Sequence, residues 1–480
     1  MGAADGLREK TAKGLFWGGL SNGIQQLLNV VFGIVLARIL SSEDYGIVGM
    51  LTLFSAVAST LQEGGFITAL VNRKPAVQRD YNAVFRISLG CSLCLYTILF
   101  FSAPLIADFF QTPELVVLSR VVFLGFVLSA LGIVPRAILF RNLQVKQTAI
   151  ITLTAQVLAG ITGITMAISG FAYWGLAFQT LTYIGAVTLF SWVFSHWRPT
   201  NDFSWSPVRE MFGFSSRIML TNLLTAINNN LFVALLAKVY DKNTAGYYSQ
   251  ANKWNAMGYL LIRNMVSGVA QPVFAQATAK EQQLTILRKM LRFTAFVSFP
   301  LMLGLSLIAE DFIVLTITEK WLPSARLMQW LCVWGAFYPL GNLFSDLLIS
   351  RGKSHIFLSA TVILITSQVV FVLIAAPYGI YRIVQGLTLL NIAWVFIWRY
   401  FVGREIGLTL WLMLKDTLPF AGIAVVAIGI AYVIGGSLET PLLRLLAEIP
   451  IAGAIYVGIL WLLDAKILKE SMAFFTRKHK

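Results

Sequence analysis

The chain has 480 residues, of which 57% are hydrophobic and 12% are charged, and its formal net charge is +15. Soluble domains carry about 25% charged residues, so this composition excludes an ordinary soluble protein and the basic polar surface of a nucleic-acid-binding domain. A mean hydropathy of +0.74 over the whole length instead predicts an all-α integral membrane protein.

Apolar segments long enough to cross a bilayer, about 20 residues each, follow one another along the chain with short connections. The first of them follows a short basic stretch, but it is too long for a signal peptide and lacks a small-residue cleavage site, so we expect a retained helix. The predicted spans are approximately 14–37, 45–70, 83–105, 115–135, 148–168, 172–194, 211–237, 246–274, 293–317, 327–350, 355–375, 379–401, 413–434 and 443–463.

The positions of lysine and arginine indicate the orientation of these fourteen spans. With the N-terminus on the cytoplasmic side, 27 of the 37 Lys and Arg residues fall on cytoplasmic segments. Cytoplasmic loops of membrane proteins carry such an excess of positive charge. The pattern therefore predicts that both termini are cytoplasmic.

A repeat relates positions that lie 200 residues apart. Leu20, Asn22, Asn29, Phe32, Leu36, Ala37 and Gly46 recur as Leu220, Asn222, Asn229, Phe232, Leu236, Ala237 and Gly246. Six helices separate the first helix from the seventh, so both copies run in the same direction, as in parallel-repeat transporters. We expect an N-lobe (1–195), a cytoplasmic linker (196–210), a C-lobe (211–401), and two further helices with a basic tail (402–480).

Polar side chains at membrane depth concentrate on the first, seventh and eighth helices. Such residues are costly in lipid and usually mark a pathway, and parallel lobes enclose a substrate site near the bilayer midplane. The candidate binding residues are Asn22, Gln25, Gln26 and Asn29 on the first helix, Arg217, Asn228 and Asn229 on the seventh, and Lys253, Arg263, Asn264 and Gln271 on the eighth.

Each group also has a purely structural interpretation. The amides can serve as helix–helix hydrogen bonds, Lys253 can have a structural role, and Arg263 and Arg217 lie near the inner surface. The first and seventh helices hold no acidic residue, and Glu63 is the only one on the central helices. A cationic to neutral cavity favours an anionic substrate such as a phosphate.

Catalytic and cofactor motifs are not found in the sequence. It contains no Walker-type loop, its three histidines lie far apart in predicted loops, and Cys91 and Cys94 form a CxxC inside an apolar run, where small core residues are the expected interpretation. We therefore expect neither enzyme activity, metal nor cofactor.

The opening of the chain resembles Wzx-type polysaccharide flippases. The residues that carry this resemblance are GLFWGGLSNGIQQLLNVVFGIVLARILSSEDYGIVGM with EGGFITALVNRK, and RAILFRNLQVK after the fourth helix, within about the first 150 residues. The resemblance implies the multidrug/oligosaccharidyl-lipid/polysaccharide exporter superfamily, with a MATE-like fold of two six-helix lobes plus two helices. It also implies that Lys253 and Arg263, on the helix that matches the arginine-bearing eighth helix of lipid II flippases, bind a diphosphate.

The resemblance implies translocation of an undecaprenyl-diphosphate-linked oligosaccharide across the bacterial inner membrane, and the parallel lobes predict that this occurs by alternating access. The expected partners are this substrate, membrane lipids, and proteins of the same pathway such as a polysaccharide polymerase, but no nucleic acid. A cation-coupled multidrug exporter of the same fold is the alternative, disfavoured by the missing carboxylate on the first helix. A polysaccharide polymerase or transferase is a third hypothesis, disfavoured by the short loops.

Overall fold

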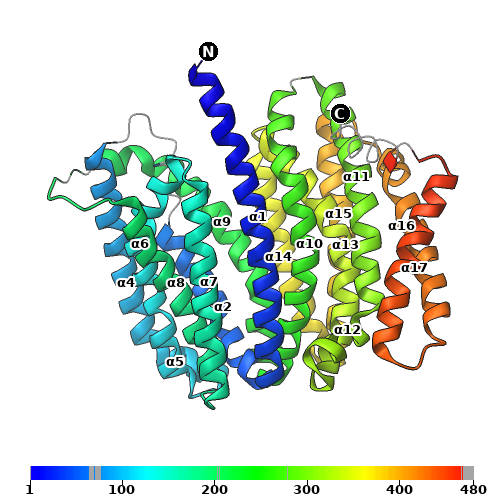
Figure 1. Cartoon of the computed structure of the whole chain (residues 1–480), viewed down its shortest axis with the longest axis horizontal. Helices are drawn as coiled ribbons and strands as arrows, with labels where there is room; N and C mark the ends of the chain where they lie inside the picture. Colours follow the sequence, from blue (N-terminus) through cyan, green and yellow to red (C-terminus); the bar gives the residue numbers. More distant parts are fainter. Residues whose placement is uncertain are drawn as a thin grey trace. The chain divides into compact units, whose positions relative to one another are not determined.

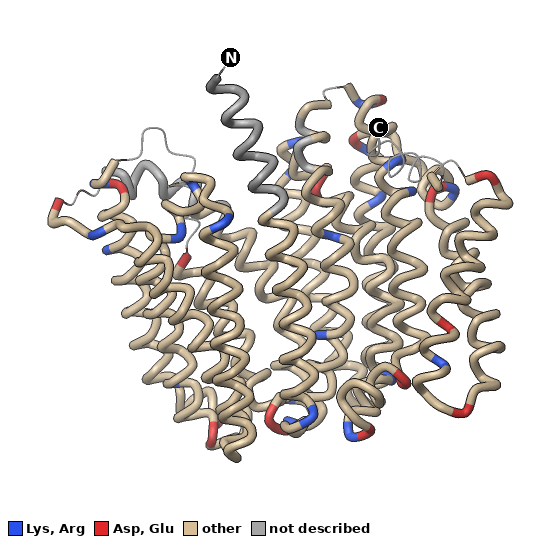
Figure 2. Tube along the Cα trace, in the orientation of Figure 1, with Lys and Arg blue, Asp and Glu red and all other residues tan. Residues whose placement is uncertain are grey.

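The described part of the chain is helical, with short turns between the helices (Figure 1). This computed structural model describes residues 2–63, 70, 77–202, 204, 206–277, 279–465, 467 and 468, and it describes side chains in those ranges from residue 17 onward, apart from 206–215, 217, 218, 271, 272 and 275. Twelve helical segments within these ranges are long and apolar enough to cross a membrane. Figure 2 shows charged residues mostly near helix ends and few along the middles, as a polytopic membrane protein requires.

Internal contacts divide the chain into an N-terminal unit, Met1–Gly246, and a C-terminal unit, Tyr247–Lys480. In the N-terminal unit α8 packs against both α6 and α7, while α1 lies along α7, α4 along α6, and α2 along α9. The helices of this unit are α1 (Gly2–Ile39), α2 (Ser42–Glu63), α4 (Gln78–Phe110), α5 (Leu115–Val122), α6 (Leu124–Arg141), α7 (Val145–Ile168), α8 (Trp174–Ser195) and α9 (Ser206–Val239), and α10 (Lys242–Gln276) begins in it.

Small residues allow the helices of the N-terminal unit to approach closely, which is how helices associate in membranes. A Cβ atom at Gly160 of α7 would overlap the ring of Phe32 of α1. Between α6 and α8, Thr188 donates a hydrogen bond to the Leu128 carbonyl at 2.9 Å, and the Trp192 indole donates one to the Leu131 carbonyl at 2.8 Å. The bundle is thus fixed by both glycine contacts and bonds to main-chain carbonyls.

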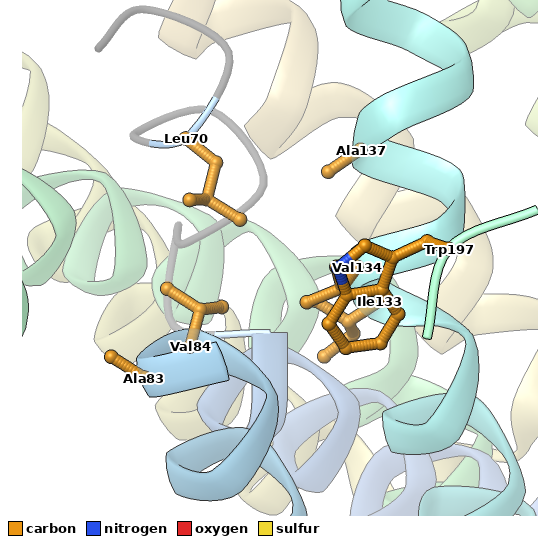
Figure 3. Packing of buried hydrophobic residues seen from close by; sticks show 7 residues of the cluster. All are labelled: Leu70, Ala83, Val84, Ile133, Val134, Ala137 and Trp197. Carbon is orange, nitrogen blue, oxygen red and sulfur yellow. The ribbon is translucent and has the colours of Figure 1, made fainter. Parts of the chain in front are cut away.

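The first residues of the predicted linker are fastened to the N-terminal unit. Trp197 is buried in an apolar cluster with residues of α4 and α6, among them Val84 and Ile133 (Figure 3). Its indole donates a hydrogen bond to Gln78 at 3.0 Å, and the Asn82 amide donates one to the carbonyl of Asp202 at 2.9 Å. The segment 196–202 is therefore a strap across the start of α4.

The two copies of the repeat meet at the first turns of α2 and α10, directly after α1 and α9. A Cβ atom at Gly46 would overlap the carbonyl of Lys242, and a Cβ atom at Gly246 would overlap the carbonyl of Ser42. Ser42 also donates a hydrogen bond to the Asn243 side chain at 2.8 Å. Because Ser42 and Lys242 are themselves 200 residues apart, each turn packs its glycine on the equivalent residue of the other.

The C-terminal unit is built around α13, whose residues are buried along most of its length. Helices α11, α12 and α15 pack on α13, α14 packs on α15, and the last two helices, α16 and α17, pack on each other and on α11 and α12. The elements are α11 (Lys280–Leu307), α12 (Ala309–Ile317), η1 (Glu319–Trp321), α13 (Leu322–Ser350), α14 (Ser354–Ala375), η2 (Ala376–Tyr378), α15 (Ile380–Ile406), α16 (Leu410–Gly435) and α17 (Pro441–Leu462).

Polar bonds fix α16 and α17 to α11. The Asp416 carboxylate of α16 is almost fully buried and accepts two hydrogen bonds from Arg288 of α11, at 2.6 and 3.1 Å. Arg292, one turn further along α11, lies 3.7 Å from the same carboxylate. On α17 the Tyr456 hydroxyl donates to the Phe296 carbonyl at 3.0 Å. The last two helices are thus an integral part of this unit.

The all-helical prediction is confirmed for the described residues, and residues 64–69 of the predicted span 45–70 lie outside them. Helices α10 and α13, which contain the predicted spans 246–274 and 327–350, are not among the twelve segments, because polar residues lower their mean hydropathy. Fourteen spans therefore stay a prediction. The contacts divide the chain within α10 rather than at the predicted linker, because α9, expected to open the C-lobe, packs along α2; the lobe bounds also stay a prediction.

Candidate functional site

Two of the four amides on α1 are hydrogen-bonded within the N-terminal unit. Gln25 donates to the Tyr183 hydroxyl of α8 at 3.2 Å, and Asn29 accepts from the Gln156 amide of α7 at 2.9 Å. The other two candidates differ from these: Asn22 is exposed and Gln26 is half-buried. The stripe predicted from spacing is therefore divided between bonds to neighbouring helices and side chains that remain accessible.

The candidate residues on α9 differ from one another in exposure and hydrogen bonding. Asn229 is exposed, whereas Asn228 is half-buried and its Oδ1 atom has no hydrogen-bond partner among the described residues. The Arg217 side chain lies outside the described residues. The structure thus leaves Asn228 with unused hydrogen-bonding capacity on this helix.

Lys253 is a half-buried cation without an acidic partner in the described part of the C-terminal unit. Its ammonium nitrogen lies 6.0 Å from the centre of the Trp254 ring, and Trp254 packs edge-on against Phe312 of α12 with ring centres 5.1 Å apart. Even partial burial of a cation without a counter-ion is costly. The ammonium group of Lys253 can therefore pair with an anion.

The turn of α10 around Lys253 holds further buried polar atoms without partners among the described residues. Gln250 is 1% exposed with both amide atoms unpaired, the Trp254 indole nitrogen is unpaired, and so is the Asn255 oxygen, on a residue that is also 1% exposed. Each such group costs about 1–3 kcal/mol. Unpaired groups concentrated on one turn are expected where a ligand supplies the missing bonds.

The remaining candidates on α10 lie further along the helix. Arg263 is half-buried, close enough to Tyr259 for an electrostatic interaction, and Asn264 is exposed. The ring of Tyr259 lies 4.2 Å from that of Tyr338 on α13, centre to centre. The Gln271 side chain is outside the described residues.

Three further polar residues could not be recognised from the sequence as buried or partly buried. Asn255 was not a candidate, although Gly335 of α13 leaves room for its oxygen. Gln62 of α2 is 1% exposed and neither of its amide atoms has a partner among the described residues. Arg136, expected in a cytoplasmic segment, points back along α6 and donates to Gly132 and Ser129, each at 3.3 Å. The sequence alone does not separate these three residues from other polar residues, because their burial depends on how the helices pack.

Metal ligands do not gather in the described ranges, where no group of three or more His, Cys, Asp or Glu side chains could hold an ion. Cys91 and Cys94 are exposed on α4, so the expectation that they are core residues is wrong, whereas Cys332 is buried in α13. The candidate site therefore consists of a lysine, amides and aromatic rings, which can bind an anion and hydroxyl groups.

Comparison with known families places more than half of the chain in one of them. The sequence pattern of the family described as "Polysaccharide biosynthesis protein" matches residues 35–326. The chain is 26% identical to the lipopolysaccharide biosynthesis protein WzxC of Escherichia coli (strain K12) over 357 residues, 73% of this chain and 72% of that protein. It is 24% identical to the teichuronic acid biosynthesis protein TuaB of Bacillus subtilis (strain 168) over 477 residues, 95% of this chain and 94% of that protein.

Comparison with solved structures gives the fold. The lipid II flippase MurJ in an inward closed conformation superimposes with a TM-score of 0.76 over 96% of this chain and 99% of that chain. The sequence identity is 17%, so this likeness concerns the helical architecture alone.

Proposed function

Because the chain belongs to the family of polysaccharide biosynthesis proteins, we propose that it flips a lipid-linked oligosaccharide across the bacterial cytoplasmic membrane. The resemblance to Wzx-type polysaccharide flippases is confirmed by this family and by the relatives WzxC and TuaB. The names of these relatives concern surface polysaccharides, and the neighbour in fold is a lipid II flippase. Both support a lipid-linked glycan as the cargo.

The observation that carries the proposal is the turn of α10 around Lys253. An undecaprenyl diphosphate headgroup supplies negative charge and acceptor oxygens, and a glycan supplies hydroxyl groups. Lys253 lacks an acidic partner among the described residues, and Gln250 and Asn255 have unused hydrogen-bonding atoms. In this proposal Lys253, with Arg263 and Arg217, binds the diphosphate, and the amides and Trp254 bind sugar.

The remaining predicted residues extend the same proposed path. Hydrogen bonding does not exclude a residue from it, because a bound amide retains further donor and acceptor positions. The proposed sugar-binding amides are Asn22, Gln25, Gln26, Asn29, Asn228, Asn229, Asn264 and Gln271. Alternating access of two lobes, with both termini cytoplasmic, would carry the headgroup across while the polyprenyl tail stays in lipid.

Replacement of the two α10 cations tests this function. We expect Lys253→Ala and Arg263→Ala to weaken headgroup binding by about tenfold, which corresponds to about 1.4 kcal/mol. In cells that lack the chromosomal copy, surface polysaccharide should therefore fall and the lipid-linked precursor pool should rise. Lys253→Arg retains the charge and should restore part of the signal. Lys280→Ala, at an exposed lysine that begins α11, is the matched control and should have no effect.

Normal surface polysaccharide with both cations replaced, at wild-type protein levels, would sink the proposed headgroup site. The cation-coupled multidrug exporter makes a different prediction. It would expel dyes in a manner that depends on an ion gradient, and its loss would not change the precursor pool. A dye-efflux assay in the same strains separates these two functions.

A further inference from the structure

A pocket separate from the α10 turn lies within the C-terminal unit. Its volume is about 320 Å³, near the lower end of the roughly 300–1,000 Å³ typical of small-molecule sites. It lies where the start of α12, the first turns of α13 and the start of α15 meet, and the charge pattern predicts this region to be extracytoplasmic. The lining residues are Glu310, Arg326, Gln329, Trp330, Tyr381 and Gln385.

Two helix faces supply most of this lining. Arg326, Gln329 and Trp330 share one face of α13, at spacings of three and four residues, and Tyr381 and Gln385 share one face of α15. Both aromatic rings remain partly accessible, Trp330 at 37% and Tyr381 at 38%. The pocket therefore presents two large aromatic side chains together with amide and charged groups.

Hydrogen bonds fix the backbone beneath these side chains. Ser306 of α11 donates to the Gln329 carbonyl at 2.9 Å, and Thr388 of α15 donates to the Trp330 carbonyl at 3.1 Å. A pocket on a fixed backbone loses little conformational freedom when a ligand binds.

Polar groups in the pocket are also oriented. The Gln385 oxygen accepts a bond from Arg382 at 3.3 Å, and the amide nitrogen of the same side chain is a donor. Arg326 and Glu310 lie 4.0 Å apart on side chains that are 60% and 49% exposed. Because both side chains are this exposed, the Arg326 guanidinium retains hydrogen-bond donors for a ligand and the Glu310 carboxylate retains acceptors.

We propose that this pocket binds a pyranose residue of a glycan. A sugar ring has one apolar C–H face, which fits an aromatic surface, and a rim of hydroxyl groups, which fits paired amide, guanidinium and carboxylate groups. The inference rests on the proposed function, since the cargo of the flippase supplies the glycan. The pocket would hold the glycan on the side where it emerges.

The test uses the full-length protein in lipid nanodiscs and saturation-transfer NMR. The probe is the oligosaccharide mixture from partial acid hydrolysis of the source cells' surface polysaccharide. We expect the wild type to transfer saturation to sugar ring protons, and Tyr381→Ala and Trp330→Ala to bind roughly three- to tenfold more weakly, the scale of one aromatic contact. Tyr381→Phe keeps the ring and should bind nearly as the wild type does.

Tyr378→Ala is the matched control. Tyr378 is the last residue of η2, before α15 begins, and it is 73% exposed and does not line the pocket, so its loss should leave the sugar signal unchanged. No saturation transfer by the wild type would overturn the proposal. Equal transfer by the wild type and both alanine variants would also overturn it and leave the aromatic side chains as a membrane-interface belt.

Different experimental results would contradict the pocket proposal and the transport proposal. If surface polysaccharide is normal without the protein, the transport proposal fails, whereas the binding measurement remains valid. If Lys253→Ala abolishes surface polysaccharide but the pocket variants bind sugar as the wild type does, only the pocket proposal fails.

Discussion

Helices α1 and α10 carry similar stripes of polar residues, but the two stripes differ in how they are satisfied. On α1, Gln25 and Asn29 are bonded to side chains of α8 and α7. On α10, Gln250 and Asn255 are almost fully buried with amide atoms that have no partner among the described residues. A stripe of polar residues therefore forms helix–helix hydrogen bonds on α1, whereas on α10 it includes hydrogen-bonding atoms that have no partner among the described residues.

The same distinction applies to charged residues of the C-terminal unit. Asp416 is buried and paired with Arg288 and Arg292, whereas Lys253 has no acidic partner among the described residues. A satisfied group mainly supports stability, and an unsatisfied group reduces stability in the absence of ligand. The two classes therefore predict opposite responses to mutation.

The largest expected loss of stability follows replacement of Asp416. Asp416→Ala leaves Arg288 without its buried partner and should lower stability by roughly 2–4 kcal/mol, less than for a fully buried pair because both arginines are partly exposed. Thermal unfolding of the purified protein measures this change. Asp202→Ala is the control, because its pair with Arg79 is about half exposed and should contribute less than about 1 kcal/mol. Equal losses of stability in Asp416→Ala and Asp202→Ala would contradict the distinction between the buried and the exposed ion pair.

A smaller loss is expected for the amide pair between α1 and α7. Gln156→Leu removes the donor to Asn29 and leaves a half-buried oxygen unpaired, which should cost about 1–3 kcal/mol. Surface polysaccharide should fall only as far as the protein level falls. Gln26→Leu, at a half-buried amide of α1 for which no hydrogen bond is seen among described residues, is the comparison. Loss of transport at a normal protein level in Gln156→Leu would mean that Gln156 contributes to transport beyond its structural bond to Asn29.

The sequence predicted the helices because membrane spans are long and apolar, which a hydropathy window detects. It placed their ends less well, because caps are polar and local: α4 begins at Gln78, before the predicted 83, where Asp80 accepts a bond from the Val77 amide at 3.0 Å. The partners of Gln25 and Asn29 lie far along the chain, so only tertiary packing separates them from Gln250 and Asn255.

The smallest change in stability, and the sharpest test of the comparison, is expected for Gln250→Met. Methionine has a similar size and no unpaired amide, so stability should stay constant or rise by about 1 kcal/mol. Surface polysaccharide should nevertheless fall, because the bonds that Gln250 offers to the cargo are lost. Thermal unfolding and the polysaccharide assay, applied to the same variant, separate these effects. A loss of stability as large as that of Gln156→Leu would mean that Gln250 has a partner in the folded protein, and α10 would then resemble α1.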